Sequence, residues 1–216
     1  MKPIQNAGGH VGCTARAYPI AYNTAIKAGA VVKLSAGLVV LAGASEAGAI
    51  LGIAAENHPG TADALNLRAD GTEILVYDNP ELVFECKAPT FAASGGSATT
   101  VTAATSAVAT TTGDIFNGGI LVSPTGKARM VTDFANASTT NTFTVPSGET
   151  AAASDVYTLY PPIGCTGAFA LDTDRISLIL STANLGLKVV GYDMDRGMVK
   201  LMAVLHSLGV QNKDAT

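Results

Sequence analysis

Three histidines and a few neighbouring polar side chains are the residues of this chain whose types could support catalysis. His10, His58 and His206 lie far apart, and none has a nearby Ser or Cys in a turn that would expose a nucleophile. Glu56-Asn57 precede His58 as a conceivable base, but Pro59-Gly60 follow at once, which is typical of a loop. The sequence therefore predicts no catalytic residues and a protein that is not an enzyme.

Phosphate and nucleic-acid binding are equally weakly supported. Thr125-Gly126-Lys127-Ala128 has part of a phosphate-binding loop, but the first Gly and the hydroxyl after Lys are missing, so a hairpin turn is expected. The 13 basic residues are spread thinly over a chain of net charge −4 and form no stripe. Neutralisation of a phosphate backbone needs such a stripe, so we expect no nucleic-acid partner and no cofactor.

Carboxylates and thiols provide the remaining candidates for a metal site. Two Asp-x-Asp pairs are present, Asp172 with Asp174 and Asp193 with Asp195. Their oxygens could bind Ca²⁺, but the spacing is not that of an EF-hand, and turn chemistry is the favoured interpretation. Cys13, Cys86 and Cys165 lie far apart without a Cys-x-x-Cys pair, and His10 with Cys13 lacks a second ligand pair. We expect free thiols and no metal.

Composition indicates what kind of surface the chain presents. Hydrophobic residues make up 48%, whereas only 14% are charged and 6% aromatic, and 23 are glycines. Ordinary globular domains are about 25% charged, so much of this surface is small and neutral. Such a surface suits flat contacts between subunits, although a plain Gly/Ala/Thr-rich β-protein is the alternative. The apolar stretch 34–55 is interrupted by Glu46 and glycines, and no signal segment is recognised, so we expect a soluble protein made in a reducing cytoplasm.

The elements that would position any site are short, β-branched runs bounded by Gly, Pro, Ser and Asn. This pattern predicts a mainly β fold, a small β-barrel or sandwich core with an inserted β-module. The expected strands are 18–22, 31–34, 38–41, 49–55, 73–77, 82–86, 114–122, 128–133, 141–145, 155–160, 175–180, 186–193 and 198–205. The last could also be a short helix, but its length favours a strand.

Changes in composition along the chain predict its organisation. Residues 1–17 are polar and Gly-rich and are expected to form an N-terminal arm. Residues 18–92 and 162–216 are expected to form the core domain, and 93–161 the inserted module. The module's lead-in, within 92–113, has no charged or aromatic side chain and should order poorly alone.

Two parts of the chain resemble proteins of bacteriophage particles. Tyr18-Pro-Ile20, residues 26–37, Ile50-Leu-Gly-Ile53 and residues 76–85 resemble small head proteins of the decoration, or capsid cement, type. The pieces 114–122, 128–134, 142–145 and 154–159 are similar to a β-module of many phage virion proteins. The resemblance implies a subunit on the outside of a phage head that reinforces contacts between major capsid proteins, often as a trimer.

These observations lead to one expected function and two alternatives. The expected role is a virion structural protein that binds the major capsid protein through buried area, with many modest contacts acting together. The candidate capsid-contact residues are Lys2, Pro3, Ile4, Tyr18 and Tyr22. A tail or fibre module that binds a host glycan would need aromatic platforms, and an enzyme would need an exposed nucleophile with a matched base.

Overall fold

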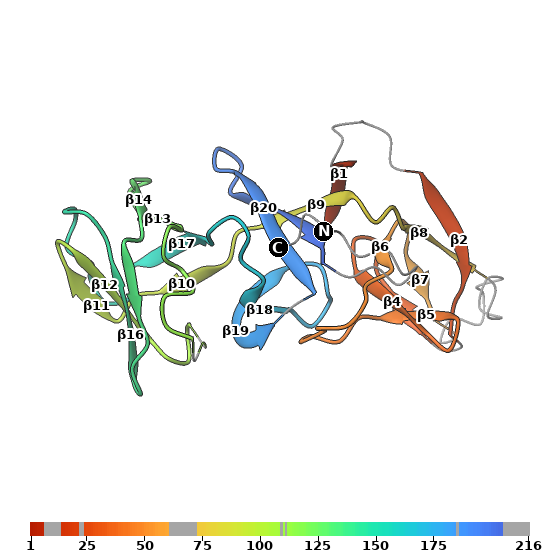
Figure 1. The fold of residues 1–216 in the computed structure, drawn as a ribbon, viewed down its shortest axis with the longest axis horizontal. Helices are drawn as coiled ribbons and strands as arrows, with labels where there is room; N and C mark the ends of the chain where they lie inside the picture. Colours follow the sequence, from red (N-terminus) through yellow and green to blue (C-terminus); the bar gives the residue numbers. More distant parts are fainter. Residues whose placement is uncertain are drawn as a thin grey trace.

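The mainly β fold predicted from the sequence is confirmed. The structure is a computed structural model that describes residues 1–6, 14–21, 24–60, 73–108, 110, 112–184 and 186–204. All regular elements in these ranges are strands, and none of the described segments is a helix suited to crossing a membrane. Three groups of strands follow one another along the long axis of the molecule (Figure 1).

The first group is a five-stranded sheet at one end of the molecule. Its order is β2 (Ala15–Pro19), β8 (Glu73–Tyr77), β6 (Gly52–Ala54), β4 (Val31–Ser35) and β5 (Leu38–Leu41). One parallel bridge, Ile20 to Val39, brings the edge strands β2 and β5 together. No continuous ladder joins these edges among the described residues, so the arrangement is sandwich-like and not a closed barrel. Alternate side chains such as Val32, Val39 and Ile74 fill its core.

The central group consists of a four-stranded sheet, a hairpin and a small two-stranded sheet next to the first group. The four-stranded sheet has the order β1 (Lys2–Asn6), β9 (Leu82–Lys87), β21 (Met198–Ala203) and β20 (Leu187–Asp193). The hairpin consists of β18 (Gly167–Leu171) and β19 (Leu178–Asn184), and the small sheet of β3 (Ala25–Ile26) and β7 (His58–Pro59). Strand β21 confirms the strand interpretation of its segment.

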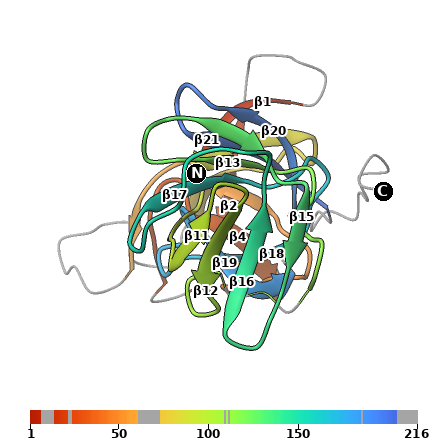
Figure 2. The same cartoon turned by 90° about the vertical axis from the view of Figure 1, so that its left-hand side faces the viewer.

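The third group is a two-layer sandwich built from consecutive strands, which we call the module. One sheet has the order β10 (Thr90–Ala92), β17 (Val156–Tyr160), β13 (Ile120–Val122) and β14 (Ala128–Met130). The other has the order β11 (Gly95–Ser97), β12 (Thr100–Ala104), β16 (Thr140–Thr144) and β15 (Asp133–Ala135). Figure 2 looks onto this end of the molecule. Among the described strands, each module strand pairs only within the module, while its folding as a separate unit stays a prediction.

Aromatic rings fill the space between the module's sheets and continue into the central group. Phe91 of one sheet stacks on Phe143 of the other at 5.1 Å, and Phe134 lies 4.8 Å from Phe143. Phe116 lies 4.9 Å from Phe134 and 6.3 Å from Phe169 of β18. The buried residues of the module and central group therefore form one hydrophobic cluster.

Both segments expected to order poorly alone contain strands in the structure. Lys2–Asn6 form strand β1 on β9 of the same chain, so the first part of the expected arm belongs to a sheet. Residues 92–113 contain β11 and β12, and Val101, Ala103 and Val108 are buried. For the second segment the sequence left a linker or a strand held only by its neighbours open, and β12 is such a strand, because it pairs along its whole length with β16, a partner distant in sequence.

Two expected strands begin later in the structure because local turns occupy their first residues. Strand β13 starts at Ile120, since Asp114 and Gly118 have positive φ angles and the Gly119 N–H donates to the Phe116 carbonyl. Strand β19 starts at Leu178, since the Asp172 carboxylate accepts the N–H groups of Ile176 and Ser177. Before β19, the Asp172 carboxylate therefore competes with a neighbouring strand for these backbone N–H groups.

Gly52 allows β6 and β8 to approach each other, which gives a test of this pairing. A Cβ at Gly52 would lie 1.9 Å from the Tyr77 carbonyl oxygen. We expect Gly52→Ala to destabilise the protein by about 1–3 kcal/mol, or about 2–4 °C in Tm per kcal/mol. Gly113→Ala is the matched control, because a Cβ there meets nothing within 4 Å. Equal thermal melting of the two variants would contradict the close approach.

Candidate interaction surface

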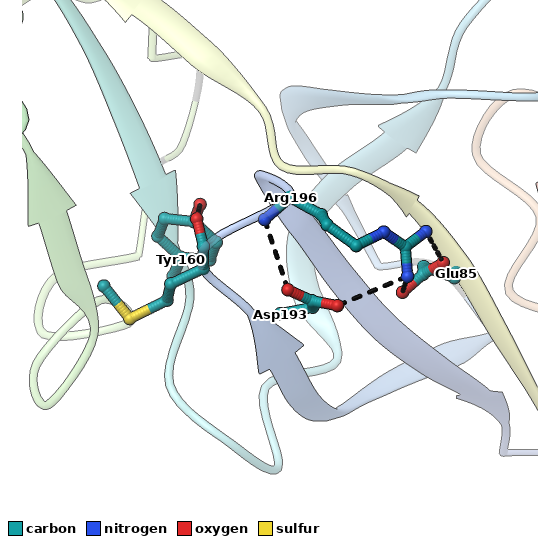
Figure 3. A network of polar contacts seen from close by, with 5 residues as sticks. Glu85, Tyr160, Asp193 and Arg196 are labelled. Carbon is teal, nitrogen blue, oxygen red and sulfur yellow. Dashed lines mark hydrogen bonds and ion pairs between the residues drawn. The ribbon is translucent and has the colours of Figure 1, made fainter.

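A buried carboxylate, Glu85, lies at the junction between the module and the central group and pairs with the Arg196 side chain. Glu85 of β9 has a side chain only 1% exposed, and it accepts two hydrogen bonds from the Arg196 guanidinium, at 3.0 and 2.5 Å. Asp193 lies 3.3 Å from the same guanidinium and also accepts the Arg196 backbone N–H (Figure 3). Bidentate pairing of this kind fixes both distance and orientation.

The tip of the β20–β21 hairpin, residues 192–197, contacts both chain segments that connect the module to the central group. We call it the clamp. The Ala88 N–H donates to the Gly197 carbonyl at 2.9 Å, on the segment that leads into the module. On the returning segment, the Tyr160 hydroxyl donates to the Met194 carbonyl at 3.4 Å and the Tyr192 hydroxyl donates to the Pro161 carbonyl. The clamp therefore hydrogen-bonds to both segments that connect the module to the rest of the chain.

The outward side of the module's first sheet carries no charged side chain. Residues that pair directly across β10, β17, β13 and β14 lie on the same side of the sheet. The outward residues, which we call the uncharged face, are Thr90, Ala92, Ile120, Val122, Ala128, Met130, Val156 and Thr158. Met130 and Val156 are 55% and 54% exposed. The alternating residues Phe91, Leu121 and Leu159 are buried on the inward side.

The opposite side of the module has a different chemical character. Thr100 and Thr102 of β12 lie directly across from Thr144 and Thr142 of β16, and Thr140 continues the row. These half-buried side chains form what we call the threonine face. Their hydroxyl groups remain compatible with water, and threonine pairs across strands stabilise a sheet. The module thus has one apolar outer side and one hydroxyl-rich outer side.

The structure separates the contact residues that the sequence suggested. Lys2, Pro3 and Ile4 lie in β1, Tyr18 lies in β2, and Tyr22 is outside the described residues. Tyr18 is half-buried, and its hydroxyl donates to the buried Asp78 carboxylate, which also lies 3.6 Å from Arg16. The uncharged face was not identified from the sequence. The signal was present, because large inward side chains alternate with uncharged outward ones along β10 and β17.

The polar groups singled out for catalysis or metal binding have local roles where the structure describes them. His58 is buried, with Nδ1 3.1 Å from the Thr24 carbonyl oxygen. Lys127 pairs with Glu149 at 2.7 Å, which holds the pKa of that carboxyl at about 2. Burial raises the pKa of the Cys86 thiol to about 12, which leaves it unreactive. Among the described residues, no three His, Cys, Asp or Glu side chains form a group that could hold a metal ion.

Comparisons with known proteins give no further information on this surface. No protein-family model, curated protein or solved structure matches the chain. The interpretation of the surface therefore depends on its geometry and chemistry.

The clamp predicts that Arg196 contributes more to stability than an ordinary surface arginine. Replacing it with Leu leaves the Glu85 carboxylate buried without its bidentate partner. We expect a loss of about 2 kcal/mol in the free energy of unfolding, since Arg196 is itself half-exposed. The double variant Glu85→Leu with Arg196→Leu should recover part of this loss. Urea unfolding measures both values.

An exposed ion pair of the module provides the control for this experiment. Lys127 and Glu149 have side chains 62% and 31% exposed, so Lys127→Leu should cost less than about 1 kcal/mol. A loss on Arg196→Leu no larger than that on Lys127→Leu would show that the clamp does not depend on the ion pair.

Tyr18 predicts a specific loss of stability in alkali. Burial and the hydrogen bond to Asp78 raise the pKa of Tyr18 to about 12, above its unfolded value of 10.0. The resulting stability is fully present below pH 10 and is lost as pH rises through 12. At neutral pH, Tyr18→Phe should lower the unfolding free energy by about 1 kcal/mol. Urea unfolding from pH 8 to about 12 should show wild type and variant converging, and a constant difference would refute the assignment.

Proposed function

We propose that this chain is a structural protein of a bacteriophage particle that decorates the capsid and binds the major capsid protein lattice. The observation that carries the proposal is the uncharged face, a four-stranded surface with two large apolar side chains more than half exposed. Charged residues are depleted at the centres of protein interfaces, and this face has none. The resemblance of the sequence to head decoration proteins supports the same role.

The size of the uncharged face favours a repeating partner over a single isolated one. Four strands about 4.8 Å apart, each three to five residues long at about 3.3 Å per residue, give roughly 200–300 Å². A stable pairwise interface uses about 800 Å² on each partner. One such face therefore provides a weak contact, and firm attachment requires several contacts made together. A capsid lattice, with further copies of this chain beside each other, supplies that multiplicity.

The alternative roles have less support in the structure. A glycan-binding tail or fibre module would present aromatic rings to solvent. The large side chains that are most exposed among the described residues are all aliphatic or Met: Leu38, Leu75, Met130, Val156, Ile163, Ile179 and Met194. A lattice of protein surfaces uses such side chains, whereas a sugar ring stacks on aromatic ones.

The proposal is tested on purified bacteriophage particles from the virus that encodes this protein. Electron cryomicroscopy should show the molecule on the outer surface of the shell. We expect Val156→Asp to lower the particle-bound amount about tenfold or more, because burying an unpaired carboxylate costs over 1.4 kcal/mol. Thr142→Asp, which adds the same charge to the threonine face, should bind like wild type. Particles without density for the chain would refute the proposal.

A further inference from the structure

Both outer strands of the module's first sheet have a second side without a partner strand. Among the described residues, β10 pairs only with β17, and β14 pairs only with β13. Antiparallel ladders alternate, so every second residue of an edge strand turns its N–H and C=O groups away from its neighbour. Each of these edges therefore carries backbone donors and acceptors that no described strand of the chain uses.

Hydrogen bonds beside each strand show which residues turn away from the sheet. Beside β10, the Leu159 N–H donates to the Pro89 carbonyl at 2.9 Å. Beside β14, the Val131 N–H donates to the Gly119 carbonyl at 2.8 Å. Since bonded and non-bonded positions alternate along both strands, the residues whose backbone groups point outward are Thr90 and Ala92 in β10 and Ala128 and Met130 in β14.

Other sheet edges are covered by segments of the chain itself. Along β20, the Gly164 N–H donates to the Val189 carbonyl, and the Val189 N–H donates to the Cys165 carbonyl. Beside β15, the Asp114 N–H donates to the Phe134 carbonyl. The edges of β10 and β14 have no such cover among the described residues, and the side chains of their outward residues are exposed. Uncovered edges of this kind are templates for pairing with another chain.

The two edges fit each other in direction and in chemistry. Strands β10, β17, β13 and β14 alternate in direction, so β14 of one copy is antiparallel to β10 of a second copy placed beside it in the same orientation. Ala128 then lies opposite Ala92, and Met130 opposite Thr90, and each pair exchanges both of its N–H···O=C bonds. Met130, 55% exposed in the single chain, packs against the methyl group of Thr90.

Pairing of β14 with β14 of a second copy is less favourable. Arg129 is the middle residue of that strand and would lie opposite the same arginine, and like charges directly opposite each other destabilise a sheet. In the arrangement of β14 beside β10, Arg129 lies opposite Phe91 instead. The charge on β14 therefore favours unlike edges as partners.

We propose that this chain associates with further copies of itself by pairing the β14 edge of one module with the β10 edge of the next. Such a contact is heterologous, so an assembly either closes into a ring or keeps one free edge at each end. The uncharged faces of paired copies lie on the same side and join into one continuous surface. The inference does not rest on the proposed capsid role, because it follows from the edges of the isolated chain.

Light scattering of the purified chain over a range of concentrations tests the association. Two short strands bury far less than the about 800 Å² per partner of a stable interface, so the contact is weak. We expect the average mass to be that of one chain in dilute solution and to rise at least about twofold towards 1 mM. A mass that stays that of one chain over this range would overturn the proposal.

Proline substitutions block the two edges one at a time. Ala92→Pro and Ala128→Pro each remove one outward N–H and leave the bonds to β17 and β13 in place, since proline is tolerated where an edge strand faces solvent. We expect each variant alone to keep the mass of one chain at every concentration. Ala92→Ser and Ala128→Ser keep the N–H and are the matched controls, which should associate like wild type.

A mixture of the two proline variants identifies the arrangement. Ala92→Pro keeps an intact β14 edge and Ala128→Pro an intact β10 edge, so the mixture should form pairs with one copy of each and nothing larger. Association of Ala92→Pro by itself would show pairing of β14 with β14, and association of Ala128→Pro by itself would show pairing of β10 with β10. Either result would overturn the proposal.

Hydrogen exchange of the wild-type chain gives a second measurement that needs no variant to fold. The amide protons of Thr90, Ala92, Ala128 and Met130 should exchange at least about twofold more slowly in the concentrated sample than in the dilute one. Those of the central strand β13 should exchange equally in both. Equal exchange at the four edge positions would overturn the proposal. These measurements use no particles, so a failure here leaves the capsid proposal to its own test.

Discussion

The junction between the central group and the module is built around one buried carboxylate. Glu85 lies in β9 with almost no exposed side chain, so it must be paired where it sits. Its partner Arg196 comes from a hairpin tip that also contacts both connections to the module. The ladder between β9 and β21 and this ion pair together hold the hairpin, whose tip in turn contacts the connections to the module. A hydrophobic contact alone would permit sliding, whereas a bidentate pair permits one geometry.

The continuous aromatic core reinforces that geometry. Phe116 contacts Phe134 inside the module and Phe169 in the central group, so the module cannot rotate without opening buried apolar contacts. Close-packed interiors resist such displacement. The uncharged face and the threonine face consequently point in fixed and opposite directions from the molecule. An interface made of weak contacts benefits from this rigidity, because no ordering cost is added on binding.

Sequence reasoning succeeded where the pattern is local and failed where long-range partners decide. The alternation of Phe143 and Val145 with threonines marked a half-buried strand, and β16 has that pattern. Strand β12 could not be told from a linker because its inward residues, Val101 and Ala103, are small, and only pairing with distant β16 makes them core residues. Glu85 and Arg196 are 111 residues apart, and no spacing in the sequence links them. The bond from the Tyr18 hydroxyl to Asp78 likewise joins residues 60 positions apart, while the capsid contact expected at Tyr18 stays a prediction.

The modest area of the uncharged face reconciles two opposing requirements. A larger apolar surface would bind one partner tightly, but it would also promote aggregation before assembly. A small face flanked by the Lys127–Glu149 pair, on a chain with net charge −4 and a hydroxyl-rich opposite side, offers little apolar area for association between free molecules. Strong attachment then arises only on a surface that repeats its binding positions, since effective concentration multiplies contacts that are individually weak. Under the proposed function, the same property would confine binding to assembled shells and exclude isolated shell subunits.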